Sequence, residues 1–156
     1  MCEGILVPRL TIPDALVADC GLNDHIVTPA PGADPIVQFL YRDHRAVLPV
    51  WWDGQLRILP WGNRNKASKL PRTGCCWQEN LDAGRWSWLR PEAVEIPACC
   101  GFEKGIWYQV QEGLHGVAVR DEHGQPHAYV ITQPATHYYA IMTRSERMPV
   151  LLNQTI

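Results

Sequence analysis

The chain has 156 residues and a net charge of −2, with 46% hydrophobic and 19% charged residues, which are ordinary proportions for a globular protein. This length predicts a single domain, residues 1–156, with a core large enough to fold alone. The charge excludes a polycation, so any nucleic-acid binding must come from a local basic patch, and no apolar run of about 18 residues predicts a transmembrane helix.

In chain order, the first expected elements are a helix, a loop and a hairpin. Residues 12–20 open with Pro13 and Asp14 and continue into an apolar run, which predicts a helix. Residues 23–35 contain three prolines and a glycine and predict an extended loop. Asp53-Gly54 separates two apolar runs, 46–52 and 55–59, and this pattern is a strong signal for a two-residue hairpin.

The rest of the chain alternates short strands with turns. Residues 62–74 are polar and irregular, and residues 135–142 could form two helical turns. Residues 116–121 and 127–133 flank a turn and predict a second hairpin. Further short strands are expected at 75–79, 94–98, 105–110 and 150–152. The pattern predicts an α+β fold of mainly antiparallel strands, in a barrel-like or strongly bent sheet, with two or more short helices.

Cys2 follows the initiator methionine, and aminopeptidases usually remove Met1 when the second residue is small. The product carries an α-amine and a thiol on adjacent carbons. The amine attacks an aldehyde to form a Schiff base, and the thiol then closes a thiazolidine ring. The α-amine titrates at roughly 7.7–8.0 and a free thiol near 8.5, so both nucleophiles are partly available at neutral pH. The alternatives are that Met1 is retained, or that Cys2 is unreactive like most second-position cysteines.

Six cysteines lie at positions 2, 20, 75, 76, 99 and 100. With no export signal in the sequence, we expect a cytoplasmic protein with reduced thiols. The vicinal pairs fit zinc poorly, because ligand pairs are usually about two to four residues apart and adjacent side chains diverge on a strand. We therefore expect no metal and no other cofactor.

A basic segment, residues 54–78, contains five cations and no acidic residue. The cations are Arg57, Arg64, Lys66, Lys69 and Arg72. Tryptophans precede, interrupt and end the same stretch. Single-strand nucleic-acid binding needs cations that contact the phosphates and, next to them, aromatic rings that stack on the bases. The alternative is a solvated basic loop beside a tryptophan-rich core.

Several short motifs share an order along the chain. They are Cys2, Thr28-Pro29-Ala30-Pro31-Gly32, Trp61-Gly62, Cys76-Trp77-Gln78-Glu79 and Arg147-Met148-Pro149-Val150. Their order resembles the SOS response-associated peptidase (SRAP) family, the abasic-site DNA–protein crosslink proteins of the DNA damage response. That family begins Met-Cys-Gly-Arg and continues with Asn-Val-Ala-Pro-Gly, Arg-Trp-Gly-Leu, Gly-Trp-Tyr-Glu-Trp and His-x-Arg-Met-Pro-Val. The resemblance spans almost the whole chain as scattered matches.

The resemblance implies a protein that binds single-stranded DNA and covalently traps abasic sites through Cys2. Glu79 matches the family's catalytic glutamate and would shuttle protons. For this role we expect Glu79 within hydrogen-bond reach of the Cys2 amine, with a pKa raised by partial burial. Arg147 would hold a phosphate bidentately, unless it forms an ion pair with Glu146 or another nearby carboxylate.

The family's conserved asparagine has no direct match, and Asn63 and Asn65 are the nearest stand-ins. The full set of DNA-binding candidates is Trp61, Asn63, Arg64, Asn65, Lys66, Trp77 and Arg147. Ser145 stands where the family has its histidine. His137 is a substitute acid–base candidate, or else a structural histidine.

Three functions stay open. The first is covalent trapping of abasic sites, which Cys2 and Glu79 favour. The second is a nucleic-acid-binding module that has lost its chemistry, favoured by Ser145 and by Glu3-Gly4 in place of the family's Gly-Arg. The third is a cysteine peptidase acting on its own N-terminus, although no Cys/His pair with an orienting amide is evident. The short chain is typical of a divergent, compact and phage-derived relative, or of a fold retained without activity. We expect no membrane partner.

Overall fold

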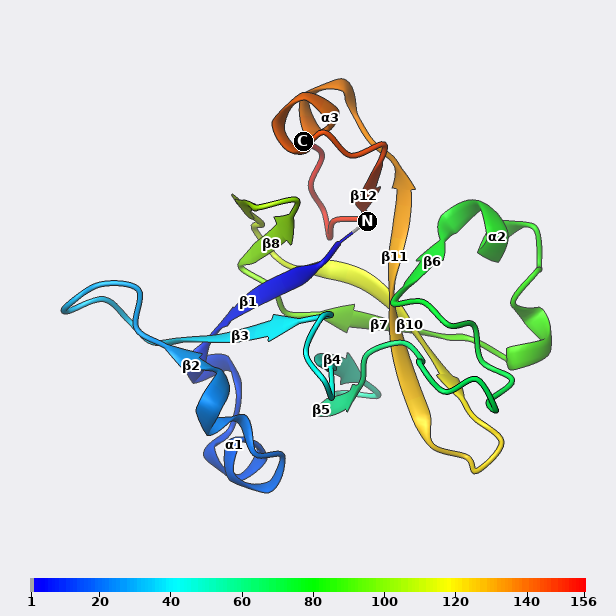
Figure 1. Ribbon diagram of the computed structural model, residues 1–156, viewed down its shortest axis with the longest axis horizontal. Coiled ribbons are helices and arrows are strands. Elements are labelled where there is room, and N and C mark those ends of the chain that lie inside the picture. Colours follow the sequence, from blue (N-terminus) through cyan, green and yellow to red (C-terminus); the bar gives the residue numbers. More distant parts are fainter. Residues whose placement is uncertain (1) are drawn as a thin grey trace.

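The computed structural model describes residues 2–156 and contains two mainly antiparallel sheets with three short α-helices around them (Figure 1). The strand order is β2-β3-β1-β8-β9 in the first sheet and β12-β11-β10-β7-β4-β5 in the second, where β6 also pairs with β11 in parallel. The second sheet bends until Trp61, just after β5, bridges Ala128 of β11. The predicted α+β class and strongly bent sheet are confirmed, without closure into a barrel among the described residues.

The elements have the following bounds. The first sheet contains β1 (Gly4–Pro8), β2 (Ile26–Val27), β3 (Ile36–Leu40), β8 (Cys100–Glu103) and β9 (Ile106–Gln109). The second contains β4 (Val47–Trp52), β5 (Gln55–Pro60), β6 (Cys75–Trp77), β7 (Glu92–Ile96), β10 (Leu114–Arg120), β11 (Pro126–Pro134) and β12 (Arg147–Pro149). The helices are α1 (Asp14–Asp19), α2 (Gln78–Asp82) and α3 (His137–Thr143), and 3-10 turns span Arg9–Thr11, Leu22–His25 and Ser87–Leu89.

Both predicted hairpins form. Asp53 and Gly54 join β4 to β5 with φ values of 52° and 75°, the left-handed pair that a two-residue turn requires. The second hairpin joins β10 to β11 over five residue pairs, from Gly116↔Val130 to Arg120↔Pro126. None of the helices described in residues 2–156 is long and apolar enough to cross a membrane.

Two predicted strands were wrong in their bounds, and four strands within residues 2–156 were not predicted. The strand expected at 75–79 ends at Trp77, and residues 78–82 form α2, which packs Leu81 against the core. The last strand is β12 rather than residues 150–152, because Arg147–Pro149 pairs with β11. Strands β1, β3 and β8 were not anticipated, and β2 lies within residues 23–35, which were expected to be an extended loop. The Cys-Gly-Phe-Glu sequence of β8 has no strand pattern, and it forms a strand because it pairs with β1.

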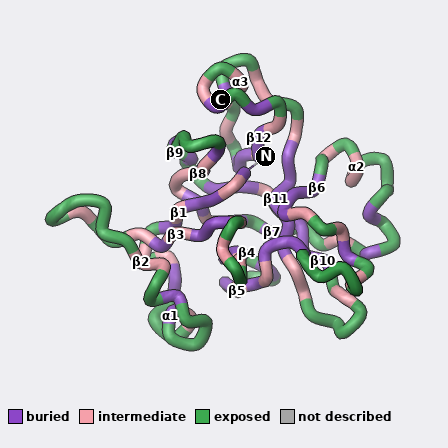
Figure 2. The backbone as a smooth tube through the Cα atoms, viewed as in Figure 1, coloured by how far each residue is buried: buried purple, intermediate pink, exposed green. Residues whose placement is uncertain are grey.

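The core divides into two clusters of buried side chains. Figure 2 shows that the buried residues follow the strands, whereas the outer loops are mostly exposed. The larger lies between the two sheets and includes Cys2, Trp52 and Trp61. The smaller lies beneath the loops at 62–74 and 83–91 and consists of Leu70, Cys76, Trp86, Leu89, Val117, Val119, Tyr129 and Ile131. At its centre the rings of Trp86 and Tyr129 meet edge to face, 5.0 Å apart. This smaller cluster supports the loop at 62–74, which carries the candidates Asn63, Asn65 and Lys66.

Candidate functional site

Cys2 lies in the core immediately before β1. Its side chain is 2% exposed, and its thiol donates to the Gly4 carbonyl at 3.3 Å. Tyr108 of β9 and Tyr139 of α3 are close enough to influence it electrostatically, and their hydroxyls are 3.2 Å apart. Burial raises the pKa of the Cys2 thiol to about 12, so the thiol is protonated at neutral pH.

Two further titratable groups, Cys75 and Glu103, approach Cys2. The Cys75 thiol is within hydrogen-bond reach of the Cys2 backbone N–H, and burial raises the Cys75 pKa to about 11. Glu103, at the end of β8, is 2% exposed, and desolvation raises the pKa of its carboxyl. Sequence reasoning missed both residues. Cys75 was visible only as half of a vicinal pair, and the position of Glu103 depends on the unanticipated β1–β8 pairing.

Glu79 and Arg147 form an ion pair rather than joining Cys2. The Arg147 Nη1 and Nη2 atoms donate to the two Glu79 carboxylate oxygens at 2.6 and 3.1 Å. Nη2 also donates to the Thr132 carbonyl at 2.9 Å, and the guanidinium lies 4.1 Å from the Trp77 ring centroid. Strand order explains the arrangement, because Thr132 is on β11, between β12 and β6.

The expected environment of Glu79 is therefore corrected. The Glu79 side chain is 48% exposed, and hydrogen bonding to Arg147 lowers its pKa instead of burial raising it. A carboxylate in this state is a weak proton donor at neutral pH. Among the described carboxyls near Cys2, the one with a raised pKa is Glu103.

A cavity of about 280 Å³ opens beside the ion pair. We call it the Arg147 cavity. Its lining consists of Pro71, Thr73, Cys75, Trp77, Asn80, Trp86, Thr132 and Arg147. Cys75 thus faces the cavity and also contacts the Cys2 backbone nitrogen. Cys2 itself lies behind this lining, and neither Glu79 nor Asn63 belongs to it.

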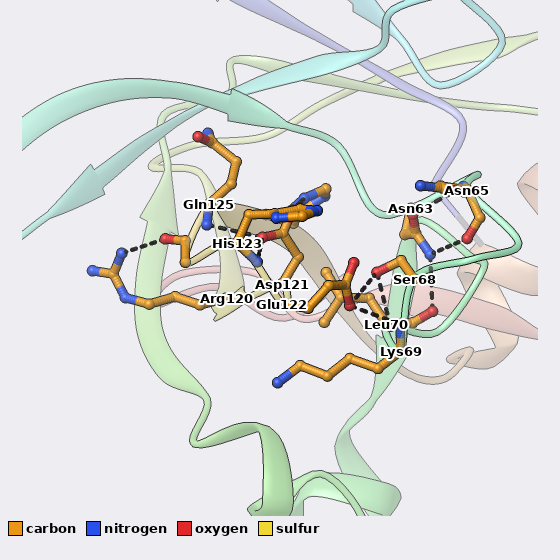
Figure 3. Close-up of polar contacts among 12 residues, drawn as sticks. Asn63, Asn65, Ser68, Lys69, Leu70, Arg120, Asp121, Glu122, His123 and Gln125 are labelled. Carbon is orange, nitrogen blue, oxygen red and sulfur yellow. Dashed lines mark hydrogen bonds and ion pairs between the residues drawn. The ribbon is translucent and has the colours of Figure 1, made fainter.

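Asn63 and Asn65 shape the loop that follows β5 (Figure 3). Asn63 is buried, and its Nδ2 donates to the Leu70 carbonyl at 2.9 Å and to the Asn65 carbonyl at 3.2 Å. The Asn65 Oδ1 accepts from the Ala67 backbone N–H at 3.0 Å. Glu122 holds the loop from the other side, by accepting from the Lys69 backbone N–H at 3.0 Å. These amides act as loop supports, and their contacts are not with Cys2.

The basic segment is only partly available to a ligand. Trp61 is 2% exposed and donates to the Gly74 carbonyl at 3.0 Å, so it cannot stack on a base. Arg64 is an exposed residue, but it donates to the Asp43 carbonyl at 2.7 Å and lies over the Tyr41 ring. Lys66 is exposed, and Trp77 is 49% exposed.

The structure places no imidazole beside Cys2 at either of the two positions considered for the family's histidine, Ser145 and His137. Ser145 is buried, and its hydroxyl donates to the Arg147 carbonyl at 3.0 Å. His137 is the exposed first residue of α3, while Tyr139, two residues later, points into the core. Within residues 2–156, no group of three or more His, Cys, Asp or Glu side chains is arranged to hold a metal ion. All six cysteines are free thiols.

No protein-family model, curated protein or solved structure matches this chain.

Proposed function

We propose that this protein binds single-stranded DNA and traps abasic sites covalently through Cys2 once Met1 has been removed. The proposal rests on the short motifs that resemble the SRAP family and on one structural observation. The Cys2 thiol is buried, and the buried Glu103 carboxyl is close enough to influence it electrostatically. A thiol close to a carboxyl group with a raised pKa has a proton donor and acceptor nearby, and this supports a functional role.

The neighbours of Cys2 suggest how the ring would form. The α-amine adds to the open aldehyde of the abasic sugar, and the resulting hydroxyl leaves as water when Glu103 donates its proton. The thiol then attacks the iminium carbon, and its proton returns to the Glu103 carboxylate. The net reaction joins aldehyde and aminothiol into a thiazolidine with loss of one water. A carboxyl with a raised pKa suits this double role better than Glu79, whose pKa is lowered.

The Arg147 cavity would receive the DNA backbone around the abasic site. Its Trp77 face can stack on a neighbouring base, and Arg147 can bind a phosphate in two-point geometry. Both Arg147 terminal nitrogens are engaged by Glu79, so a phosphate has to displace that carboxylate. Glu79 would then hold Arg147 in place in the free protein rather than transfer protons.

The second candidate is a non-covalent nucleic-acid-binding module. The position of Cys2 behind the cavity lining and the Ser145 hydroxyl in place of an imidazole favour it. The peptidase alternative is disfavoured, because a thiol nucleophile for peptide cleavage needs a lowered pKa and the pKa of Cys2 is raised.

The test uses protein whose loss of Met1 has been verified by intact mass. Incubation with single-stranded DNA carrying one abasic site should give an adduct that survives denaturing electrophoresis. Cys2→Ser should leave at most an imine that borohydride can trap. Glu103→Gln should slow crosslinking by about 10²- to 10⁴-fold. Glu79→Gln is the matched control and should slow it far less, because it alters a carboxylate outside the proton path.

Other outcomes discriminate between the candidates. Binding of abasic DNA without an adduct would leave the non-covalent module as the function. Equal slowing by Glu79→Gln and Glu103→Gln would contradict the assignment of the proton shuttle to Glu103. No single-strand binding at low salt would exclude both nucleic-acid functions.

A further inference from the structure

A second and larger cavity also adjoins the smaller core cluster, through Leu89 and Val119. Its volume is about 600 Å³, and we call it the Trp88 cavity. The lining consists of Trp52, Lys69, Trp88, Leu89, Arg90, Glu92, Ala118, Val119, Arg120, Asp121 and Gly124. The function proposed above does not use it.

Among the described residues, two of the three cations that line this cavity have no polar partner, whereas both of its acids have one. Within residues 2–156, neither the Lys69 ammonium nor the Arg90 guanidinium has a hydrogen-bond or ion-pair partner. By contrast, Asp121 accepts from His127 at 3.0 Å, and Glu92 accepts from the Trp52 indole N–H at 2.7 Å. The cavity therefore offers two available positive groups, while its carboxylates already have donors.

Figure 3 shows why the Lys69 side chain is available to a ligand. Its backbone N–H donates to Glu122 at 3.0 Å, which fixes the loop, while its side chain extends away from that contact. Arg120, on the facing hairpin, donates to the Gly124 carbonyl at 3.0 Å. Its guanidinium carbon lies 5.2 Å from the centroid of the Trp52 ring. One wall of the cavity is thus a cation held against an aromatic ring.

Trp88 and Arg90 both line the cavity and are two residues apart in the chain. Trp88 is 60% exposed, more than any other tryptophan of the chain. The 3-10 turn Ser87–Leu89 ends at Arg90, which adopts a left-handed conformation with φ of 52°. That conformation is disfavoured for a residue other than glycine, and here it ends the turn next to Trp88. An exposed indole beside an unpartnered guanidinium matches a base and its phosphate.

We propose that the Trp88 cavity binds a nucleotide unit, with Trp88 stacking on the base and Lys69 with Arg90 holding the phosphate. The unit is either a free nucleotide or part of a nucleic-acid strand. Pro71 and Trp86 line the Arg147 cavity, whereas Lys69 and Trp88, each two residues away, line this one. The proposal needs no chemistry at Cys2.

The test measures binding of three probes that carry no aldehyde: dTMP, a 12-nucleotide oligo-dT, and inorganic phosphate. The variants are Trp88→Ala, Arg90→Gln and Lys69→Gln. The matched controls are Trp107→Ala, which removes a 40% exposed tryptophan from the other sheet, and Arg45→Gln, an exposed arginine away from the cavity. Unfolding curves confirm that each variant is folded.

Trp88→Ala should weaken binding of dTMP, oligo-dT or both by about 5- to 150-fold, the usual effect of losing one stacked base. Arg90→Gln and Lys69→Gln should each reduce the slope of log affinity against log salt for oligo-dT by about 0.7. Binding of dTMP identifies a free-nucleotide site, and binding of oligo-dT alone identifies a strand subsite.

Three results would overturn the proposal. The controls could weaken binding as much as the cavity variants. Inorganic phosphate could compete as well as dTMP at equal concentration, which would reduce the site to an anion site. The third such result is that neither dTMP nor oligo-dT binds at low salt. Because no probe can be crosslinked, failure of covalent trapping at Cys2 leaves these readouts unchanged.

Discussion

Gly62→Ala should destabilise the protein far more than an ordinary glycine substitution. Gly62 has φ of 65° and begins the loop that carries Asn63, Lys69 and Pro71. A Cβ atom built there would lie 2.0 Å from the Thr73 carbonyl oxygen. Real Cβ contacts are well above 3 Å, so the backbone at Thr73 has to move by about 1 Å or more.

The expected loss in the free energy of unfolding of Gly62→Ala has two parts. The left-handed conformation costs an alanine about 1–2 kcal/mol, partly offset by the lower entropy of the unfolded chain, about 0.4–1 kcal/mol. Forcing a methyl group into a packed site adds about 1–3 kcal/mol. Gly124→Ala is the matched control, since its φ is 78° but its Cβ would meet no atom within 4 Å, so only the conformational part applies.

Urea or thermal unfolding of both variants measures the steric part directly. At about 2–4 °C per kcal/mol for a chain of this size, Gly62→Ala should melt about 2–12 °C below Gly124→Ala. The same displacement should weaken single-strand DNA binding, because residues 69 and 71 line the two cavities. Equal melting temperatures for the two variants would refute the close contact between Gly62 and Thr73.

The remaining predictions concern single side chains. Trp86→Ala should cost about 3–5 kcal/mol in the free energy of unfolding, because the ring is 7% exposed in the smaller cluster, whereas Trp88→Ala should change it by less than about 0.5 kcal/mol; similar losses would contradict the burial difference. Tyr139→Phe should cost about 0.5–1.5 kcal/mol by removing its hydrogen bond to Tyr108, and an unchanged denaturation midpoint would argue against that bond. The pKa of Asp121 is lowered on balance, since hydrogen bonds from His127 and two backbone N–H groups outweigh desolvation. This stabilisation is present above the unfolded pKa near 3.9 and is lost as pH falls through the folded pKa. Wild type should therefore exceed Asp121→Asn in stability at pH 5, and that advantage should shrink as the pH falls below about 3.9; a difference independent of pH would exclude the linkage.

Elements with strong local signals were predictable from the sequence. Asp53-Gly54 specified the β4–β5 hairpin because a type I′ turn needs left-handed residues at both positions, and Asp-Gly is a preferred pair for it. The helix expected at 12–20 forms as α1 with Pro13 as its N-cap, and the helical turns expected at 135–142 form as α3. The irregular character of residues 62–74 was also predicted correctly. Such signals act over a few residues and need no tertiary partner.

The candidate site was predicted less well, because burial and pairing decide it. Glu79 and Arg147 were identified from short motifs, but their ion pair depends on β11 lying between β6 and β12. The opposite pKa shifts of Glu79 and Glu103 also come from the tertiary structure. One carboxyl lies in solvent beside a guanidinium and the other is desolvated, and nothing in the sequence around either residue distinguishes those environments.

By itself, the sequence determined the turns, the short helices, the strand-rich α+β class and the presence of a cysteine at position 2, because each follows from local residue types. Only the tertiary structure decided that Cys2 is buried beside Cys75, Glu103, Tyr108 and Tyr139. These neighbours come from separate strands and a helix that meet only when the two sheets pack together. Desolvation depends on that packing, so the reactivity of each group is a property of the fold.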